Sequence, residues 1–129
     1  MATLIHPDVY IPESTVISKG CIISTGVFIS CNVFIDENTL IQPKACIGHD
    51  VVIGKHSVIS SLVTVGGSTK VGEQSFVGMN STLKEKITIG DHTIISMGSV
   101  VLNDIRDSVI AMGNPARVML DNVQERVFK

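Results

Sequence analysis

Residues 47–59 read Ile-Gly-His-Asp-Val-Val-Ile-Gly-Lys-His-Ser-Val-Ile, with an isoleucine at every sixth position. The same spacing continues toward both ends of the chain, through seventeen consecutive units without a gap. The large aliphatic residues of these units are Ile5, Ile11, Ile17, Ile23, Ile29, Ile35, Ile41, Ile47, Ile53, Ile59, Val65, Val71, Val77, Leu83, Ile89, Ile95 and Val101. A run of this length is far beyond chance, so the chain is organised around a six-residue repeat.

Each unit also carries a small or β-branched residue two positions before the aliphatic one, such as Val51 before Ile53. Side chains alternate along a strand, so both residues point to the same side. Glycine often follows the aliphatic residue, and we interpret it as relieving the backbone at a tight corner. These glycines are Gly48, Gly54, Gly66, Gly72, Gly78 and Gly90. Short strands and tight corners at a period of six predict an all-β, parallel β-helix whose units bury their apolar faces by stacking.

Three strands per turn give an 18-residue coil, so the seventeen units predict five to six coils stacked about 4.8 Å apart. The β-helix is expected to span residues 1–106. Residues 107–129 are expected to form a C-terminal extension of the same domain. It would contain a strand over Ser108–Met112, a turn over Gly113–Arg117 and a short helix with Asp121 as its N-cap. The extension is expected to cover the last coil, whose strand edge would otherwise be unpaired.

The composition argues against several classes of protein. A formal net charge of −2 and scattered Lys and Arg residues give no basic field for a nucleic acid. The three cysteines form no Cys-x-x-Cys pair, which argues against a disulfide framework or zinc knuckle and suits reduced thiols. No apolar run is long enough to span a membrane, and the N-terminus does not resemble a signal peptide. We expect a cytoplasmic protein with no nucleic-acid partner and no membrane span.

Residues 18 positions apart lie in one column on the outside of such a coil. One column is apolar along its full height and consists of Leu4, Ile22, Leu40, Val58, Phe76 and Ile94. A stripe of this size exceeds what a monomer normally exposes, so it predicts a subunit interface. The alternative is strand propensity alone, which favours Val and Phe on any face.

His49 and Asp50 follow Ile47 at a corner, where side chains project outward. An imidazole beside a carboxylate can act as a general base, because the acid stabilises the imidazolium. A solvated turn is the alternative. In the same column, Cys31 lies one coil below His49, and Gly67 lies one coil above it in the only Gly-Gly pair. The bare backbone at Gly67 is expected to leave room for a ligand.

A different corner carries Ser61, Met79 and Met97 in one column. Stacked methionines form an adaptable apolar ledge that suits a bound ligand. The alternative is that they fill a subunit interface.

No metal site is expected. Zinc of the carbonic-anhydrase kind requires three converging histidines. His6 and His92 lie on coils distant from His49, and His56 lies one residue further round its own corner. These four histidines therefore give no convincing triad.

Four segments carry a more specific signal: Gly48 to Gly54, Val71 to Asn80, Gly98 to Asp104, and Gly113 to Val118. Together they resemble the sialic-acid and bacterial amino-sugar acetyltransferases of the left-handed β-helix superfamily. The resemblance implies a left-handed coil, against the usual right-handed crossover preference. It also implies transfer of an acetyl group from acetyl-CoA to a hydroxyl or amine of a small acceptor, either a sugar or a nucleotide-amino sugar.

The resemblance assigns roles to individual residues. His49 matches the family's proton acceptor, and Asp50 matches the acid that raises its basicity. The positions that match the acetyl-CoA site are Val58, Gly67, Met79, Met97, Asn114 and Arg117. Val58 stands where relatives carry a second histidine that touches the acetyl group, while Asn114 and Arg117 lie near the nucleotide end. We expect a homotrimer, because a site on so narrow a prism needs a second wall.

Three alternatives remain open. A serine O-acetyltransferase would be expected to show an Asp-His-Ala-Thr-Gly-like run, which this chain lacks. A γ-carbonic-anhydrase-like protein would contain metal. A non-catalytic hexapeptide scaffold would not bind acetyl-CoA. The N-terminal nucleotide-sugar-binding domain common in the family is not part of this sequence, and so the acceptor is not identified.

Overall fold

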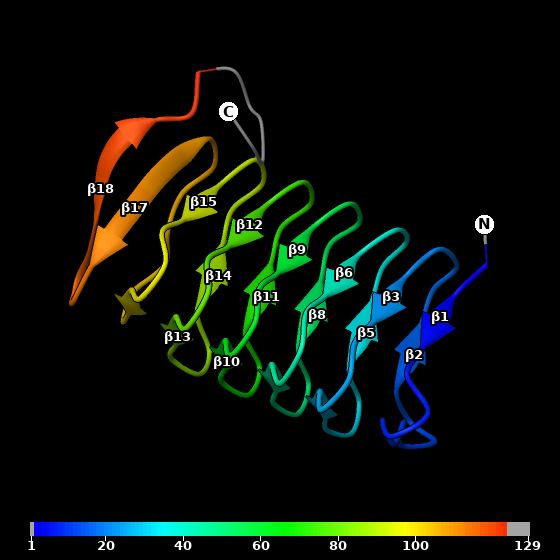
Figure 1. Ribbon diagram of the computed structural model, residues 1–129. Helices are drawn as coiled ribbons and strands as arrows, with labels where there is room; N and C mark the ends of the chain where they lie inside the picture. Colours follow the sequence, from blue (N-terminus) through cyan, green and yellow to red (C-terminus); the bar gives the residue numbers. More distant parts are fainter. Residues whose placement is uncertain (1, 124–129) are drawn as a thin grey trace.

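The computed structural model describes residues 2–123 and confirms the parallel β-helix, which has about six turns. Each turn is a triangle of short strands, and successive turns stack along one axis (Figure 1). The strand register between turns is 18 residues, as in the pairing of Leu4 with Ile22. The left-handed sense of the coil stays a prediction from the resemblance. Residues 2–123 contain no helix of the length and apolarity that a membrane crossing requires.

The strands form three sheets, one on each side of the prism, and the described strands pair in parallel except for β17 with β18. Sheet A consists of β1 (Leu4–Ile5), β3 (Ile22–Ile23), β6 (Leu40–Ile41), β9 (Val58–Ile59), β12 (Phe76–Val77), β15 (Ile94–Ile95), β17 (Val109–Gly113) and β18 (Ala116–Asp121). Sheet C consists of β4 (Phe28–Ile29), β7 (Cys46–Ile47), β10 (Thr64–Val65), β13 (Thr82–Leu83) and β16 (Val100–Val101). Sheet B consists of β2 (Val16–Ile17), β5 (Phe34–Ile35), β8 (Val52–Ile53), β11 (Lys70–Val71) and β14 (Thr88–Ile89).

The chain visits the sheets in the order A, C, B, so each turn has three corners. We call these the A/C, C/B and B/A corners, according to the sheets that they join. On the coil that contains β6, β7 and β8, the A/C corner is residues 42–44, the C/B corner is 48–50 and the B/A corner is 54–56. Because the register is constant, corresponding corners of successive coils lie above one another.

The inward aliphatic residues form the core, as the repeat predicts. The largest fully buried ones are Ile23, Ile29, Ile35, Ile41, Ile47, Ile53, Ile59, Leu83, Ile89 and Ile95. The second inward position holds many hydroxyl groups, which are costly to bury without partners. The Ser57 hydroxyl donates to the Gly72 carbonyl at 2.7 Å and accepts from the Ser75 N–H at 3.1 Å. Hydroxyls also donate to a carbonyl fifteen residues further on at Thr15, Thr39, Thr69, Ser75 and Ser81.

The backbone turns at each corner through one residue in the left-handed region. The non-glycine residues at this position have φ between 53° and 64° and are Asn32, Asn38, Lys44, Asp50, His56, Leu62, Ser68, Gln74, Asn80, Lys86 and His92. The glycines predicted to relieve the turn stand two positions earlier and have a different purpose. A Cβ on Gly54 would lie 2.6 Å from backbone atoms of Gly72 and Glu73. Close contact between coils therefore accounts for this glycine, and the turn conformation does not.

One of the seventeen units does not form a strand. Sheet C begins at β4, although the repeat predicts a strand at Tyr10–Ile11. In later coils the residue after the inward aliphatic donates its N–H to the next coil, as Ser30 does to the Ile47 carbonyl at 3.0 Å. Position 12 is a proline, which has no N–H to donate. The first coil therefore lacks this bond, and Ile11 is only partly buried.

A hairpin extends sheet A beyond the last coil. β17 pairs with β15, and β18 returns antiparallel to β17 after a turn at Asn114–Pro115. The strand expected over residues 108–112 is β17, whereas Asp121, the expected helix N-cap, is the last residue of β18. The next two residues of the expected helix, Asn122 and Val123, are not helical, so this part of the prediction was wrong, and residues 124–128 lie outside the described residues. The Asn122 side-chain amide donates to the His92 carbonyl at 2.8 Å and fastens the hairpin to the coil below.

We predict that Gly54→Ala lowers the free energy of unfolding by about 2–3 kcal/mol, because the added methyl meets backbone and not a flexible side chain. Gly98→Ala is the matched control. Gly98 has φ of +69° and nothing within 4 Å of its Cβ position, so the change should cost about 1 kcal/mol of left-handed strain. Denaturant unfolding measures both. Equal losses would contradict the explanation from coil contact.

Candidate active site

His49 and Asp50 lie at the C/B corner, directly after β7. Nδ1 of His49 is 2.9 Å from Oδ2 of Asp50, and the two side chains are 62% and 52% exposed. Asp50 occupies the left-handed position of the corner, and its N–H donates to the carbonyl of Cys31, one coil below, at 3.1 Å. The corner conformation of the repeat thus holds the carboxylate beside the imidazole.

This contact fixes which nitrogen of the ring is available for chemistry. An ionised carboxylate can only accept hydrogen bonds, so Nδ1 of His49 must carry the proton that it shares with Asp50. In the neutral ring the other nitrogen, Nε2, then has a free lone pair. If Nε2 takes up a proton, the Asp50 carboxylate stabilises the resulting positive charge. The pair can therefore act as a general base with Nε2 as the accepting atom.

The imidazole ring of His49 lies against Gly67 of the next coil. A Cβ on Gly67 would lie 2.5 Å from Nε2 and 2.7 Å from Cε1 of the ring. The space above His49 that was predicted to admit a ligand is thus occupied by the ring itself. Because Gly67 is not in the left-handed region, the nearby ring is the constraint that makes a side chain unfavourable there.

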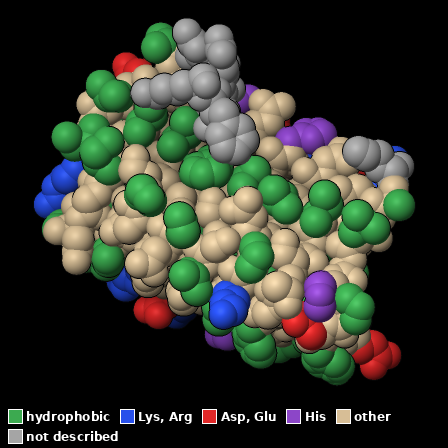
Figure 2. Space-filling view, viewed as in Figure 1, with side chains coloured by type: hydrophobic (Ala, Val, Ile, Leu, Met, Phe, Trp, Pro, Cys, Tyr) green, Lys and Arg blue, Asp and Glu red, His purple; other side chains and the backbone are tan. Residues whose placement is uncertain are grey.

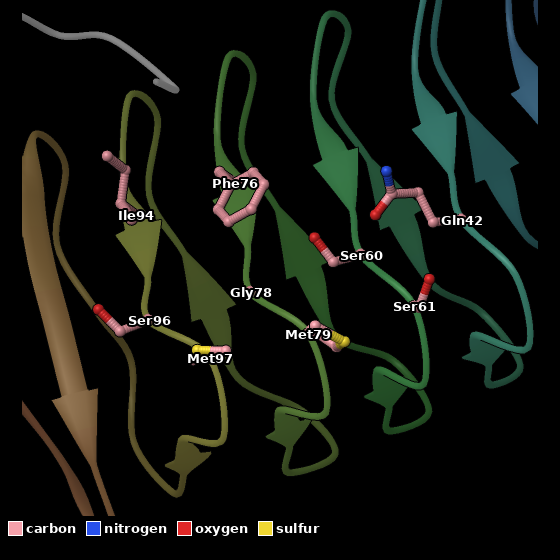
Figure 3. Close-up of a pocket in the computed structure, with 9 residues that line it drawn as sticks. All are labelled: Gln42, Ser60, Ser61, Phe76, Gly78, Met79, Ile94, Ser96 and Met97. Atoms are coloured by element: carbon pink, nitrogen blue, oxygen red, sulfur yellow. The ribbon is translucent and has the colours of Figure 1, made fainter. Parts of the chain in front are cut away.

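A groove with a volume of about 420 Å³ lies at the A/C corner and the adjacent end of sheet A (Figure 3). Phe76 and Ile94 are paired on neighbouring strands and supply apolar surface, while Met79 and Met97 lie at the corner itself. The complete lining is Gln42, Ser60, Ser61, Phe76, Gly78, Met79, Ile94, Ser96 and Met97. Apolar walls with a few polar groups are typical of small-molecule sites.

The groove adjoins the apolar column predicted on the outer face of sheet A. Leu4 and Ile22 at the N-terminal end of the column are 60% and 44% exposed. The half-buried members are Leu40, Val58, Phe76 and Ile94. Figure 2 shows hydrophobic side chains gathered across the middle of this face. The apolar surface therefore runs along sheet A and is continuous with the groove.

The predicted site residues are divided between two corners. His49, Asp50 and Gly67 lie together at the C/B corner. Met79 and Met97 line the groove at the A/C corner. The strands of sheet C separate these two corners on every coil.

Val58 and the hairpin residues belong to the side of sheet A. Val58 pairs with Phe76, which lines the groove. Asn114 lies in the hairpin turn and Arg117 in β18, beyond β17, the neighbour of β15. One chain alone therefore does not bring His49 together with most of the residues expected to bind acetyl-CoA.

A second histidine–aspartate pair lies at the first A/C corner, where Nδ1 of His6 is 2.9 Å from Oδ1 of Asp8. The Thr25 hydroxyl donates to Asp8 at 2.6 Å, and the Gly26 N–H donates at 3.2 Å. The hydroxyl and then the N–H are the main causes that hold the pKa of Asp8 below its ordinary value. Asp8 thereby fastens the first coil, which lacks its sheet C strand, to the second.

The other titratable groups are not arranged as a metal centre. Within residues 2–123, no cluster of three or more His, Cys, Asp or Glu side chains could hold a metal ion. Nδ1 of His92 is buried and has no hydrogen-bond partner among the described residues. The cysteines are free thiols, and burial raises the pKa of Cys21. Its Sγ donates to the Asp36 carbonyl at 3.0 Å, so this thiol is part of the core.

Three polar residues of the groove, Gln42, Ser60 and Ser96, were not predicted from the sequence. Each directly follows an inward aliphatic residue at the A/C corner. Steps of eighteen from Gln42 lead through Ser60 and Gly78 to Ser96. The column reading that found the apolar stripe would also have found this set.

Comparison with protein families matches residues 32–67 and 68–103 to the family described as bacterial transferase hexapeptide (six repeats). The two matches cover more than half of the chain and coincide with the regular coils. The repeat and the exposed histidine–carboxylate corner define a hexapeptide-repeat protein with a candidate active site. The chain belongs to the bacterial transferase hexapeptide family.

Solved acetyltransferase structures share the fold. A histidine variant of perosamine N-acetyltransferase from Caulobacter crescentus, in complex with CoA and GDP-perosamine, has a TM-score of 0.92 and 30% identity, covering 94% of this chain and 58% of that one. The acetyltransferase domain of PglB from Neisseria gonorrhoeae has a TM-score of 0.89 and 26% identity, covering 91% and 57%. Serine acetyltransferase from the same organism has a TM-score of 0.72 and 27% identity, covering 75% and 41%. This chain thus spans less than two thirds of each relative. No curated protein matches it.

We predict that Gly67→Ala displaces the His49 ring and breaks its contact with Asp50, while the free energy of unfolding changes by less than about 1 kcal/mol. The half-exposed ring can move, so the overlap is relieved outside the core. A crystal structure of the variant and denaturant unfolding test the two parts.

The control is the double variant Gly67→Ala, His49→Ala. It should be as stable as His49→Ala alone, because the added methyl then meets no ring. If the His49 ring keeps its position in the Gly67→Ala structure, the close contact between that ring and Gly67 is contradicted.

Proposed function

We propose that the protein transfers an acetyl group from acetyl-CoA to a hydroxyl or amine of a sugar or nucleotide-amino sugar, with His49 as general base. The observation that carries the proposal is the 2.9 Å contact from Asp50 to Nδ1 of His49, which leaves Nε2 available at an exposed corner. The relatives named as acetyltransferases, one of them in complex with CoA, support the choice of donor. Family membership supports the transfer class.

The residues present fit a CoA-type donor. At the C/B corner, the absence of a side chain at Gly67 lets the His49 ring keep its position beside Asp50. The groove at the A/C corner offers Met79 and Met97 to an arm that is partly apolar. The donor would supply the acyl group already activated as a thioester. The protein's own contribution is to bind and orient the reactants and to remove a proton.

His49 performs the proton transfer in this proposal. Nε2 accepts the proton of the attacking hydroxyl or amine as that atom bonds to the acyl carbon and the carbon–sulfur bond breaks. The Asp50 carboxylate keeps the Nδ1 proton in place and stabilises the charge that the ring gains. The proton held on Nε2 can then pass to the departing thiolate, so the ring returns to its starting state.

We further propose a homotrimer in which neighbouring copies complete the site. The groove with its apolar column and the His49 corner are different surfaces of one chain. A contact between them is heterologous, and a heterologous contact that closes on itself gives a ring. Such a ring would cover the column on sheet A and bring one copy's His49 toward another copy's methionines.

The acceptor and the compartment are also part of the proposal. Perosamine N-acetyltransferase, named in complex with GDP-perosamine, supports a nucleotide-linked amino sugar, whereas the serine acetyltransferase is the weaker structural match. A panel of amino sugars, nucleotide-amino sugars and serine, read by release of free thiol, tests the choice. The free cysteines suit the reducing cytoplasm, where we place the protein.

We predict that His49→Ala lowers kcat roughly 10²- to 10⁴-fold with nearly unchanged affinity for acetyl-CoA, because a general base contributes mainly to the chemical step. His56→Ala is the matched control, since His56 is another exposed corner histidine but lies at the B/A corner. Steady-state kinetics and calorimetry provide the two readouts. Wild-type turnover by His49→Ala on a confirmed acceptor would overturn the assigned role.

We predict that Phe76→Glu prevents assembly, because burying an unpaired charge in a subunit interface costs several kcal/mol. Sedimentation at micromolar concentration should then show monomers, and activity should fall. Thr82→Glu, an exposed change on sheet C, serves as the control for added charge. A monomeric wild-type protein would contradict the trimer.

A further inference from the structure

One serine of the groove at the A/C corner is buried while its hydroxyl makes no hydrogen bond. Ser60 is 4% exposed, and its backbone N–H donates to the Val77 carbonyl at 3.0 Å. Its side-chain oxygen has no hydrogen-bond partner within residues 2–123. This differs from the inward hydroxyls of the coil, such as Ser57, which bond to the backbone. A buried hydroxyl without a partner is costly, so a ligand that supplies one is favoured.

The groove is the side from which a partner can reach this hydroxyl. Ser60 lines the groove, and Figure 3 shows its oxygen directed toward the side where Phe76 lies. Phe76 and Ile94 are apolar and offer no hydrogen bond. Gly78, one coil above Ser60 in the same column, brings no side chain into the groove. A carbonyl oxygen of a bound molecule is a suitable partner, because a serine hydroxyl donates to it.

Ser60 lies at the height along the prism that the His49 ring reaches. Nε2 of His49 is 2.5 Å from the Cβ position of Gly67, so the ring leans one coil upward. Ser60 and Gly67 belong to the same coil, where they follow β9 and β10. The apolar column runs along the whole of sheet A, and a copy that covers it must lie parallel to the prism. In a ring of parallel copies, Nε2 of one copy is therefore level with Ser60 of the next.

The other polar side chains of the groove are placed less well. Gln42 lies one coil below Ser60 and Ser96 lies two coils above it, which is about 4.8 Å and 10 Å along the axis. Ser61 is on the same coil as Ser60, but it is partly exposed, so water can satisfy its hydroxyl. Ser60 alone combines the height of the His49 ring with a buried hydroxyl that lacks a partner among the described residues.

We propose that the Ser60 hydroxyl of one copy donates a hydrogen bond to the acyl carbonyl oxygen of the thioester, while His49 of the neighbouring copy deprotonates the acceptor. This inference rests on the proposed function and adds a further catalytic residue to it. When the acceptor bonds to the acyl carbon, the carbonyl electron pair moves onto the oxygen, and the hydrogen bond stabilises this charge. When the carbon–sulfur bond breaks, the carbonyl re-forms and its electron pair leaves with sulfur. Ser60 keeps its proton throughout.

The first test compares acetyl-CoA with CoA by calorimetry, because only acetyl-CoA has the acyl carbonyl. Ser60→Ala should bind acetyl-CoA about three- to tenfold more weakly than wild type, while its affinity for CoA stays within about twofold, as expected for one neutral hydrogen bond. Ser24→Ala is the matched control. Ser24 occupies the same position of the A/C corner two coils below and lies outside the groove. It should bind both molecules as wild type does.

Two further readouts separate this role from a structural one. The denaturant midpoint of Ser60→Ala should not fall, because the alanine loses no hydrogen bond of the free protein. The carbonyl of bound acetyl-CoA, isotopically labelled at its carbon, should absorb infrared light at lower frequency in wild type than in Ser60→Ala. A hydrogen bond to the oxygen weakens the carbonyl bond and so lowers this frequency.

The second test examines whether Ser60 and His49 act from different copies. On a confirmed acceptor, Ser60→Ala should lower kcat about 10²- to 10³-fold, as does loss of one donor to a developing oxyanion. Ser60→Ala and His49→Ala are then co-expressed in equal amounts. In randomly mixed trimers, about a quarter of the sites combine an intact Ser60 with an intact His49 from the next copy, so activity should recover to about that fraction of wild type.

Four results would overturn the inference: unchanged acetyl-CoA affinity in Ser60→Ala, an equal loss of affinity for CoA, a lower unfolding midpoint, or no recovery of activity in the mixed trimers. A wild-type protein that binds neither acetyl-CoA nor CoA would instead overturn the proposed function. The two failures are thus distinguishable from the wild-type titrations alone.

Discussion

Backbone hydrogen bonding between successive coils is the constraint on which the rest of the structure depends. Each strand is only two residues long within the regular coils, so no strand is stable except through its neighbours above and below. The ladder keeps a register of 18 residues, and this register places each inward position over another inward position. The same bonds fix the corners, since the left-handed residue of one coil donates to the coil below. The functional groups inherit their spacing from this ladder.

Much of the fold could be predicted because the repeat is regular. A period of six specifies which side chains point inward, and the buried isoleucines follow it coil after coil. The prediction failed at Pro12, which has no N–H to donate to the hydrogen bonds between coils. It also failed at the corner glycines, because either the turn conformation or close contact between coils could explain a glycine there. At Gly54 the decisive contact is with backbone 18 and 19 residues away. The pattern within one six-residue unit gives no information about a contact between residues so far apart in the sequence.

The candidate site was predictable only in part, for a physical reason. Reading columns placed Gly67 above His49, but it could not show that the flexible imidazole folds onto the glycine. The columns likewise aligned Met79 with Met97 without giving the groove between sheet and corner. The resemblance combined these residues in one cofactor site. The solved relative is a longer chain than this one. Within a single copy of this chain, His49 and the methionines of the groove lie on different corners.

The fixed register has a consequence for how such proteins can change. Groups on one corner are separated by whole coils, so their spacing can vary only in steps of about 4.8 Å, each requiring 18 residues. A substitution can change the chemical group that one coil presents, but it cannot move that group along the axis by a fraction of a coil. An insertion of six residues would instead carry every later residue to the next face. The spacing between two groups that bind one molecule can therefore be matched to the length of that molecule only in whole-coil increments.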